Sequence, residues 1–320
     1  TITKYNMKFY SSTLFIMEIS YNKYLINRRW INYKYDKSSG FKDEIPNVWW
    51  SLNSRFYVDR DFNVISDEVF LEEKDITSQR GHGFVGLSDL RIYKNEDDYY
   101  FIATNMDPDR FIPQMSSAKY DIDSESFELN RNVILPSFYG SEHSRIYEKN
   151  WSFVEYKHIL HVVFNWYPLQ LGKINYETNA LDITEIKYTT PEYFKGARGG
   201  TPGYIHNNEI WFVLNKAQTY RKNNMLEKKQ HWRYQHFIAI FDINMNLLRY
   251  SELFKLGDHP IEFCIGLIVR DTAIIMSCSL KDTESIVATY EKQYIETKIK
   301  WYRIGLGEAE SKVVSNGVNI

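Results

Sequence analysis

Cysteine is scarce in this chain of 320 residues, and several targeting signals are missing altogether. The two cysteines, Cys264 and Cys278, both lie inside apolar runs. We interpret them as buried thiols of a reducing compartment, although two cysteines on adjacent strands could also form a disulfide. No hydrophobic run is long enough to span a bilayer, and no segment is organised as a signal peptide. We therefore expect a cytoplasmic protein without a membrane span.

The chain also lacks a large net charge and the common catalytic motifs. The chain has 39 Lys and Arg against 41 Asp and Glu, which gives a formal net charge of −2. This balance does not predict a nucleic-acid partner. The eight histidines and two cysteines form no HExxH or CxxC pair, so we predict neither a metal nor a cofactor. A nucleophile elbow, a P-loop and a GxGxxG loop are missing, which argues against several hydrolase, NTPase and dinucleotide-binding classes.

Aromatic residues, by contrast, are abundant, with 25 Tyr, 19 Phe and 8 Trp making up 16% of the chain. Aromatic side chains favour β-strands. Helical periodicity is rare, whereas short or alternating apolar runs broken by polar turns are common. The sequence therefore predicts an all-β protein.

A unit of apolar strand, short polar turn and apolar strand recurs roughly every fifty to seventy-odd residues. The five units lie in residues 14–27, 89–104, 151–165, 202–215 and 266–277. Further strands lie between them, and about four strands per repeat is typical of propeller blades. We predict a five-bladed β-propeller, with an irregular β-sandwich as the alternative.

No linker rich in Gly, Pro or Ser divides the chain, so we expect residues 1–307 to form a single domain. Residues 218–232 are rich in Lys and Gln and are expected to form a loop or a short helix. Residues 308–320 are weakly apolar and read as a C-terminal tail, or as the lead into a flanking domain of a longer protein.

Polar residues near the starts of the first strands of the blades should converge, because these strands line the channel and the loops at one end of a propeller surround a pocket. Asp89 and Arg91 are two residues apart, so in a regular strand they point to the same side. The residues expected at this pocket are Arg29, Asn32, Tyr33, Asp89, Arg91, Glu148, Lys149, Asn150, Arg198, Glu262 and Asp282.

Carboxylates in the company of arginines suggest a particular chemistry. The guanidinium fork suits phosphate, because it can bind two oxygens at once. A nearby carboxylic acid can protonate a glycosidic or phosphate oxygen, provided that burial raises its pKa more than the cations lower it. Glycosyl transfer with a phosphate or nucleoside diphosphate leaving group needs both features.

Simpler interpretations of the same residues stay open. Asp89 could pair with Arg91 or cap a turn, and Glu148 with Lys149 could be an exposed charge pair. Arg198 lies in a glycine-rich loop, where a ligand can approach the backbone. His206 and His236 fit strand or turn positions, although His236 could reach the pocket.

The order of these elements resembles the five-bladed superfamily of β-mannoside phosphorylases and related mannosyltransferases, which is glycoside hydrolase family 130-like. Gly86–Ile92 resembles the family's G-x-E-D-P-R-I strand, whose Asp is the catalytic acid, and this implies that role for Asp89. The other matching segments are Glu148–Trp151, Gly199–Pro202 with Glu209–Phe212, and Ile261–Leu267 with Ser279–Asp282. The resemblance covers residues 14–290.

A branch of uncharacterised, predicted glycosyltransferases is more similar still. It shares an N-x-R-x-x-N-Y strand, an E-K-N-W segment and a W-x-P turn, which correspond here to Asn27–Tyr33, Glu148–Trp151 and Trp166–Pro168.

This chain also departs from the phosphorylase pattern. Ser88 and Leu90 replace the Glu and Pro that flank the catalytic Asp, and Leu214-Asn215 replaces a tyrosine–histidine pair. That histidine helps to bind phosphate in the phosphorylases. The resemblance therefore favours a nucleotide-sugar donor over inorganic phosphate as co-substrate.

Together, the residues and the resemblance predict a glycosyltransferase. It would move a sugar, with mannose as the candidate, from a nucleotide sugar or sugar phosphate to a glycan acceptor, with Asp89 as general acid or base. The residues expected to bind donor phosphate are Arg29, Arg91, Lys149, Arg198 and His236. Those expected to contact sugar are Asn32, Tyr33, Asn150, Trp166, Glu262 and Asp282. The alternatives are a glycoside phosphorylase or hydrolase, and a non-catalytic carbohydrate-binding propeller.

Overall fold

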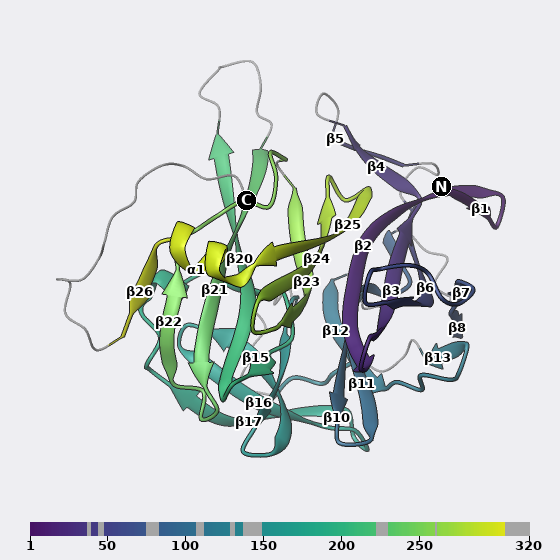
Figure 1. The fold of residues 1–320 in the computed structure, drawn as a ribbon. Coiled ribbons are helices and arrows are strands. Elements are labelled where there is room, and N and C mark those ends of the chain that lie inside the picture. Colours follow the sequence, from purple (N-terminus) through teal and green to yellow (C-terminus); the bar gives the residue numbers. More distant parts are fainter. Residues whose placement is uncertain are drawn as a thin grey trace.

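The computed structural model describes residues 1–36, 40–43, 48–74, 83–106, 112–128, 132–136, 149–221, 230–259 and 261–304. Five main β-sheets follow one another along the chain and form the blades of a propeller (Figure 1). The prediction of an all-β, five-bladed propeller is thus confirmed. No helix in these described ranges is both long and apolar enough to cross a membrane.

Blade 1 contains β1 (Ile2–Lys4), β2 (Met7–Ser20), β3 (Lys23–Ile31), β6 (Val48–Asp59), β7 (Val69–Phe70) and β9 (Gly83–Val85). Blade 2 contains β10 (Ser88–Asn95), β11 (Asp98–Met106) and β12 (Pro113–Lys119). Blade 3 contains β14 (Ser152–Tyr156), β15 (Ile159–Trp166), β16 (Leu169–Asn175) and β17 (Ala180–Lys187).

Blade 4 contains β18 (Arg198–Gly199), β19 (Tyr204–His206), β20 (Glu209–Arg221), β21 (Gln230–Asp242), β22 (Leu247–Ser251) and β26 (Trp301–Arg303). Blade 5 contains β23 (Glu262–Val269), β24 (Ala273–Leu280) and β25 (Glu284–Glu291). The remaining elements are β4 (Tyr33–Asp36), β5 (Gly40–Asp43), β8 (Glu72–Lys74), β13 (Ser126–Glu128), a 3-10 turn (Glu192–Phe194) and α1 (Lys292–Lys298).

The five predicted hairpins are all antiparallel strand pairs, namely β2–β3, β10–β11, β14–β15, β19–β20 and β23–β24. Two of their turns show why the sequence signal was strong. Lys157-His158 and Asn207-Asn208 each have positive φ at both residues. A two-residue turn of this kind has a twist that matches the flanking strands, so it fixes the hairpin register.

The prediction of a loop or short helix at residues 218–232 is wrong for residues 218–221 and 230–232, which are β-strand. There β20 and β21 continue their ladder, with Gln218 opposite Arg233 and Arg221 opposite Gln230. Backbone pairing extends a strand whatever the side-chain composition, so a Lys/Gln-rich segment can still be β-structure.

Blades 1 and 5 close the ring through polar side chains. The Arg270 guanidinium donates to Glu18 at 2.9 Å and to the Tyr24 hydroxyl at 2.6 Å. Close to the other end of the same interface, Ser12 Oγ donates to Asp282 at 2.8 Å. The first and last blades therefore meet directly, and residues from both reach the same end of the channel.

Glycine is required where inner strands approach one another. A Cβ at Gly200 would clash with the carbonyl oxygen of Val213 and lie 2.7 Å from that of Cys264. A Cβ at Gly266 would clash with Ser277 Oγ and lie 2.8 Å from the Ile16 nitrogen. Only a residue without a side chain fits at these two positions.

Cys264 and Cys278 lie opposite each other on β23 and β24. Both are buried and both are free thiols. This agrees with the interpretation of the pair as buried thiols.

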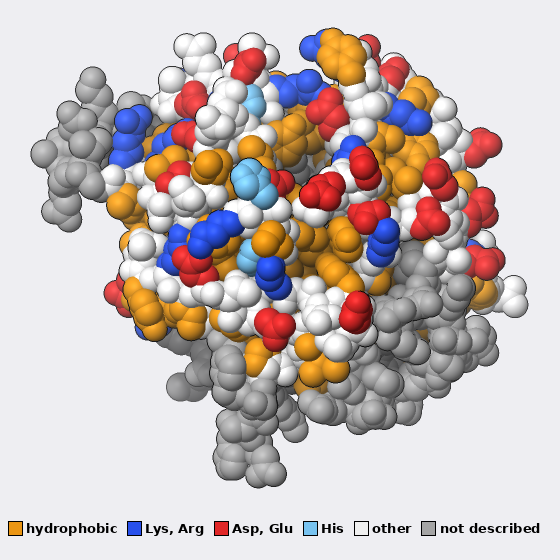
Figure 2. All heavy atoms as spheres, turned by 90° about the horizontal axis from the view of Figure 1, so that it is seen from below, with side chains coloured by type: hydrophobic (Ala, Val, Ile, Leu, Met, Phe, Trp, Pro, Cys, Tyr) orange, Lys and Arg blue, Asp and Glu red, His pale blue; other side chains and the backbone are white. Residues whose placement is uncertain are grey.

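The two ends of the channel differ in chemistry. At the end where several hairpins turn, a cavity of about 500 Å³ is lined by apolar and aromatic residues such as Tyr21, Tyr204 and Ile205, together with the charged residues Glu18, Lys94 and Glu155. Figure 2 views the molecule from below and shows hydrophobic side chains in the middle of this face. The carboxylates and cations singled out in the sequence gather at the opposite end.

Candidate active site

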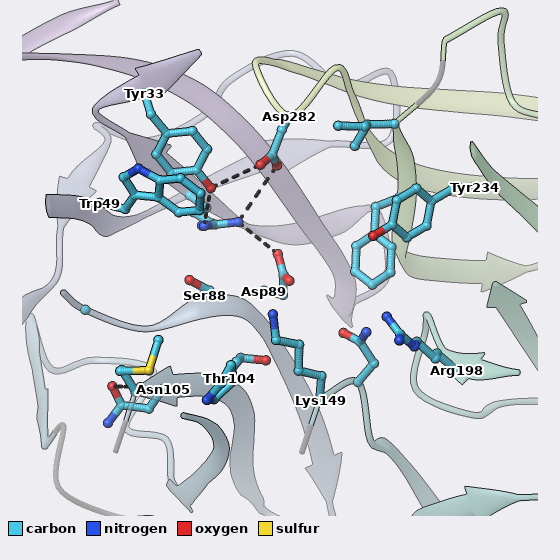
Figure 3. A pocket seen from close by; sticks show the side chains of 17 residues that line it. Tyr33, Trp49, Ser88, Asp89, Thr104, Asn105, Lys149, Arg198, Tyr234 and Asp282 are labelled. Atoms are coloured by element: carbon cyan, nitrogen blue, oxygen red, sulfur yellow. Dashed lines mark hydrogen bonds and ion pairs between the residues drawn. The ribbon is translucent and has the colours of Figure 1, made fainter. Parts of the chain in front are cut away.

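A second cavity, of about 270 Å³, is formed where β3 and β11 end and where β10, β18 and β23 begin (Figure 3). Blades 1, 2, 4 and 5 contribute to its wall, together with the segment just before blade 3. Of the predicted site residues, those that line it are Arg29, Tyr33, Asp89, Lys149, Asn150, Arg198 and Asp282. The structure thus brings together predicted residues that are up to 253 positions apart (282 − 29).

Asp89 sits in a β-bulge. Ser88 pairs with Thr104 and Arg91 with Ile102, so β10 carries one more residue than β11 across this interval. Asp89 also has a φ of +55°, in the left-handed region. A bulge bends the strand and re-aims a side chain, which explains why Asp89 faces the cavity.

A second bulge supplies hydroxyl groups to the carboxylates. In β2, Ser11 pairs with Trp30 and Leu14 pairs with Arg28. Two residues of β2, Ser12 and Thr13, therefore lie opposite one residue of β3. Thr13 Oγ1 donates to Asp89 Oδ1 at 3.0 Å, and Ser12 Oγ donates to Asp282 Oδ1 at 2.8 Å. Adjacent residues of one bulge therefore support both acids.

Arg29 lies between the two carboxylates. One terminal nitrogen is 3.2 Å from Asp89 Oδ1 and 3.9 Å from Asp282 Oδ1. The other donates to the Tyr33 hydroxyl at 3.0 Å, and Nε donates to Ser51 at 2.8 Å. Burial alone would lower the pKa of Arg29, but Tyr33, Asp89 and Asp282 outweigh it and raise that pKa. Arg29 is thus a permanent cation that is already committed to protein partners.

Asp282 lies on the turn between β24 and β25, with a φ of +60°. Its Oδ2 accepts a hydrogen bond from the Tyr33 hydroxyl at 3.1 Å. Burial raises the pKa of Asp282, and the charge of Asp89 adds to this, although Arg29 and the two hydroxyls oppose it. Burial also raises the pKa of Tyr33, so its hydroxyl stays protonated at neutral pH and can donate.

Two further cations face Asp89 from the neighbouring blades. Lys149 precedes β14 and Arg198 opens β18, and Figure 3 shows both across the cavity from Tyr33 and Trp49. Their side chains make no ion pair or hydrogen bond with any other described residue. Desolvation lowers the pKa of Lys149, and the Arg198 and Arg29 charges act in the same direction, whereas the Asp89 and Asp282 charges oppose them. Unlike Arg29, these two groups are available to an anion.

Arg91 does not reach the cavity, which corrects the expectation that it binds donor phosphate. Its side chain is fully buried, with Nε donating to the Gly200 carbonyl at 2.5 Å and one terminal nitrogen donating to the Asp89 carbonyl at 3.1 Å. The expectation that Asp89 and Arg91 point to the same side is also wrong, because the bulge between them breaks the alternation. Burial lowers the pKa of Arg91 to about 10, so it is still a cation at neutral pH.

Glu262 and His236 are likewise internal. The Glu262 carboxylate accepts from the backbone N–H groups of Leu256 at 2.8 Å and His259 at 2.9 Å, so it holds the preceding loop and not a sugar. His236 Nε2 accepts from the Cys264 N–H at 3.3 Å. Burial lowers the pKa of His236 to about 3, so it is neutral and cannot pair with a phosphate.

Asn32 and Trp166 also have structural positions. Asn32 is buried and bonds the Trp50 N–H at 2.7 Å and the Val48 carbonyl at 3.0 Å. Trp166 packs in the hydrophobic core of blades 3 and 4, where its ring meets Phe212 edge-on. Glu148 lies outside the described residues.

The sequence reasoning missed several residues of the cavity wall. Trp49 lies beside Tyr33, with 4.9 Å between ring centroids, and Tyr234 packs edge-on against Phe263. Alternation along β6 could have revealed that one of the two adjacent tryptophans at its start faces inward. The sequence gives no indication that Ser12 and Thr13 bond the two carboxylates, because these contacts depend on the bulge in β2.

In the part of the chain that the structure describes, no three His, Cys, Asp or Glu residues form a group that could hold a metal ion. The arrangement instead combines two carboxylates, two available cations and an aromatic wall. This set of groups can bind an anion and move a proton in one place.

No protein-family model and no curated protein sequence matches this chain. Solved structures do match over nearly their whole length. The β-1,2-mannobiose phosphorylase from Listeria innocua has a TM-score of 0.57 at 10% identity, covering 92% of this chain and 94% of the phosphorylase. A glycosyl hydrolase from Bacteroides ovatus has a TM-score of 0.54 at 12% identity, with 89% and 85% covered.

MPT-1 of Leishmania mexicana, described as a GDP-Man-dependent mannosyltransferase, has a TM-score of 0.53 at 10% identity, with 97% of this chain and 89% of MPT-1 covered. The chain shares their fold. At these identities the likeness shows the fold alone, which is the five-bladed propeller expected from the sequence.

Proposed function

We propose that this protein transfers a glycosyl group from a donor that carries a phosphate or diphosphate to a glycan acceptor, with Asp89 as the proton-transferring residue. The observation that carries the proposal is the position of Asp89. Its side chain is 22% exposed, and all its hydrogen bonds within the described residues end on Oδ1. Oδ2 is therefore available to a ligand in the cavity.

The charges on either side of Asp89 support an anionic donor. Among the described residues, Lys149 and Arg198 form no ion pair, so a phosphate beside them would gain two charge-assisted contacts without displacing such a pair. Of the described residues that line the wall, three are cations and two are carboxylates. A leaving group that departs with an extra negative charge would be stabilised by the same two side chains.

The wall around Tyr33 supports a sugar. Tyr33 and Trp49 form an aromatic surface, and Asp282 next to them offers carboxylate oxygens to hydroxyl groups. Aromatic side chains bury the apolar face of a ring while polar neighbours bond its edge. In this arrangement Asp89 lies between the anion and the aromatic surface, where the anomeric carbon would be.

In the proposed transfer, proton removal from the acceptor accompanies cleavage of the donor's glycosyl–phosphate bond. Asp89 takes the proton of an acceptor hydroxyl while the oxygen attacks the anomeric carbon, and the bond between that carbon and the phosphate oxygen breaks. The departing phosphate keeps the electron pair beside Lys149 and Arg198. Mannose is the candidate sugar, since one protein with this fold is described as a GDP-Man-dependent mannosyltransferase and another as a mannobiose phosphorylase.

The position of Asn215 supports a nucleotide sugar over free phosphate. Asn215 replaces a phosphate-binding histidine in the resemblance, and here it is fully buried, with its side chain donating to the Arg198 carbonyl at 3.4 Å. Asn215 thus bonds the backbone of the strand that carries Arg198, and it adds no charge to the cavity.

A glycoside phosphorylase is the second candidate, since a phosphorylase has the same fold. The same cations would then hold inorganic phosphate as the nucleophile, and Asp89 would protonate the glycosidic oxygen.

A ligand screen separates these candidates. We expect GDP-mannose or another nucleotide sugar to raise the unfolding temperature, because a ligand at one hundred times its Kd stabilises the folded state by about 2.7 kcal/mol. The hit is then incubated with oligosaccharide acceptors and the released nucleoside diphosphate is measured. Stabilisation by phosphate alone, with release of sugar 1-phosphate from a mannoside, favours the phosphorylase. Glycan binding without turnover for any donor contradicts both enzymatic proposals.

A further inference from the structure

We propose that Arg91 is a positioning residue. It holds the main chain at Asp89 so that the Asp89 side chain faces the cavity. This role rests on the proposed function only in making Asp89 the reactive group. Arg91 is part of no ligand surface, since its side chain has no exposed area and is absent from the cavity wall.

The contacts of Arg91 reach from blade 2 to the segments at the starts of blades 3, 4 and 5. From β10 of blade 2 its guanidinium donates to the Gly200 carbonyl of blade 4 at 2.5 Å and to Asn150 Oδ1, just before blade 3, at 3.3 Å. The ring of Phe263 in blade 5 lies 5.6 Å away. A planar fork with donors in several directions can satisfy all these partners at once, which an ammonium group on a flexible stem cannot.

The key contact is with the bulge itself. One terminal nitrogen of Arg91 donates to the main-chain carbonyl of Asp89 at 3.1 Å. Asp89 and Asn150 both have left-handed backbones, with φ of +55° and +62°, and both line the cavity. Asp and Asn adopt this conformation more readily than most residues, but the surrounding structure still has to fix it. Arg91 bonds the main chain of Asp89 and the side chain of Asn150, so its guanidinium ties the bulge to the segment before blade 3.

These contacts give a structural role to Arg91, which the sequence alone predicts to bind phosphate. Arg198, in contrast, is exposed in the cavity and has no side-chain partner among the described residues. The two arginines therefore have separable roles, with Arg198 on the ligand and Arg91 on the backbone that presents the acid.

The test compares Arg91→Lys with Arg198→Lys as the matched change at a ligand-facing arginine. For Arg91→Lys we expect kcat to fall at least tenfold, KM for the donor to stay within twofold, and the thermal shift caused by inorganic phosphate to match that of the unchanged protein. Arg198→Lys should reduce that phosphate shift. Loss of the phosphate shift in Arg91→Lys, or an unchanged kcat, overturns the proposal.

A crystal structure of Arg91→Lys gives a readout that does not depend on turnover. We expect the 3.2 Å contact between Asp89 and Arg29 to be lost or lengthened while the blades stay in place. An unmoved Asp89 contradicts the positioning role. If the unchanged protein turns over no donor, the proposed function fails, but this structural comparison still decides the role of Arg91.

A measurement on the unchanged protein covers the case in which the variant does not fold. Phenylglyoxal modifies accessible arginines, and the modified sites are mapped by mass spectrometry with and without phosphate. We expect Arg198 to react and to be protected by phosphate, and Arg91 to stay unmodified. Modification of Arg91 that phosphate prevents would show that it meets the ligand, and would overturn the proposal.

Discussion

At the scale of single residues, the two carboxylates of the cavity differ in how fully they are bonded. Asp282 accepts from Ser12 on one oxygen and from Tyr33 on the other. Asp89 has Thr13 and Arg29 on the same oxygen, which leaves the second one available. This difference supports our proposal that Asp89 transfers the proton and that Asp282 has a supporting role.

Asp282 should leave a signature in the pH dependence of stability. Its pKa in the folded protein is raised above the ordinary value of 3.8, so in this range the folded state holds more protons than the unfolded state. The free energy of unfolding contributed by this group therefore falls as pH rises from about 4 through the raised pKa. We expect urea titrations of Asp282→Asn to lack this fall. Identical pH profiles for the two proteins would refute the raised pKa.

Trp49 should affect sugar binding without affecting anion binding. Removing its ring with Trp49→Ala should cost about 1 kcal/mol of glycan affinity, or roughly fivefold in Kd. Calorimetric titration with an oligosaccharide and with phosphate measures the two ligands separately. Tyr188→Ala, at a tyrosine that is 84% exposed away from this cavity, is the control. Equal loss for both ligands would place Trp49 outside a sugar-specific surface.

At the scale of elements, the hairpins were predictable and the bulges were not. Polar turns such as Asn207-Asn208 need positive φ at both residues, and asparagine tolerates this conformation, so the sequence alone indicates the turn. The bulges at Ser12-Thr13 and at Asp89 depend on how one strand aligns with its neighbour. Regular alternation therefore predicted one shared surface for Asp89 and Arg91, whereas only Asp89 lines the cavity, and it gave no reason to consider Thr13.

Buried polar residues were the other source of error. Glu262, His236 and Asn32 stand close to the predicted pocket in sequence, but each bonds a backbone group inside the protein. A sequence shows that a residue is polar and near a strand end. It does not show whether a loop such as 256–259 supplies the N–H groups that turn a carboxylate into a structural anchor.

At the scale of the whole molecule, the period of the repeats predicted five blades because each blade is a local unit. The closure of the ring is non-local, and it brings Asp282 of blade 5 against Ser12 and Arg29 of blade 1. The site therefore depends on this interface. Damage to the interface should reach the cavity even where no cavity residue changes.

Gly266→Val tests this dependence. The added side chain would clash with Ser277 and with the backbone of Ile16 in blade 1, so we expect a loss of about 1–3 kcal/mol in the free energy of unfolding. Weaker phosphate binding should accompany it. At Gly257 a Cβ would make only ordinary contacts, the nearest at 3.5 Å, so Gly257→Ala should change stability little. Full stability of Gly266→Val would contradict the tight approach of blades 1 and 5.

The most direct measurement of the central claim is the turnover of Asp89→Asn. Asparagine has nearly the same shape and tolerates the left-handed backbone, so the fold and the thermal shift by the donor should be kept. The control is Asp97→Asn, at the exposed turn of the same hairpin, far along β10 from the cavity. With the donor found by the ligand screen, we predict that Asp89→Asn loses at least about 100-fold in kcat while Asp97→Asn keeps full activity. Turnover by Asp89→Asn at the rate of the unchanged protein would contradict the assignment of Asp89.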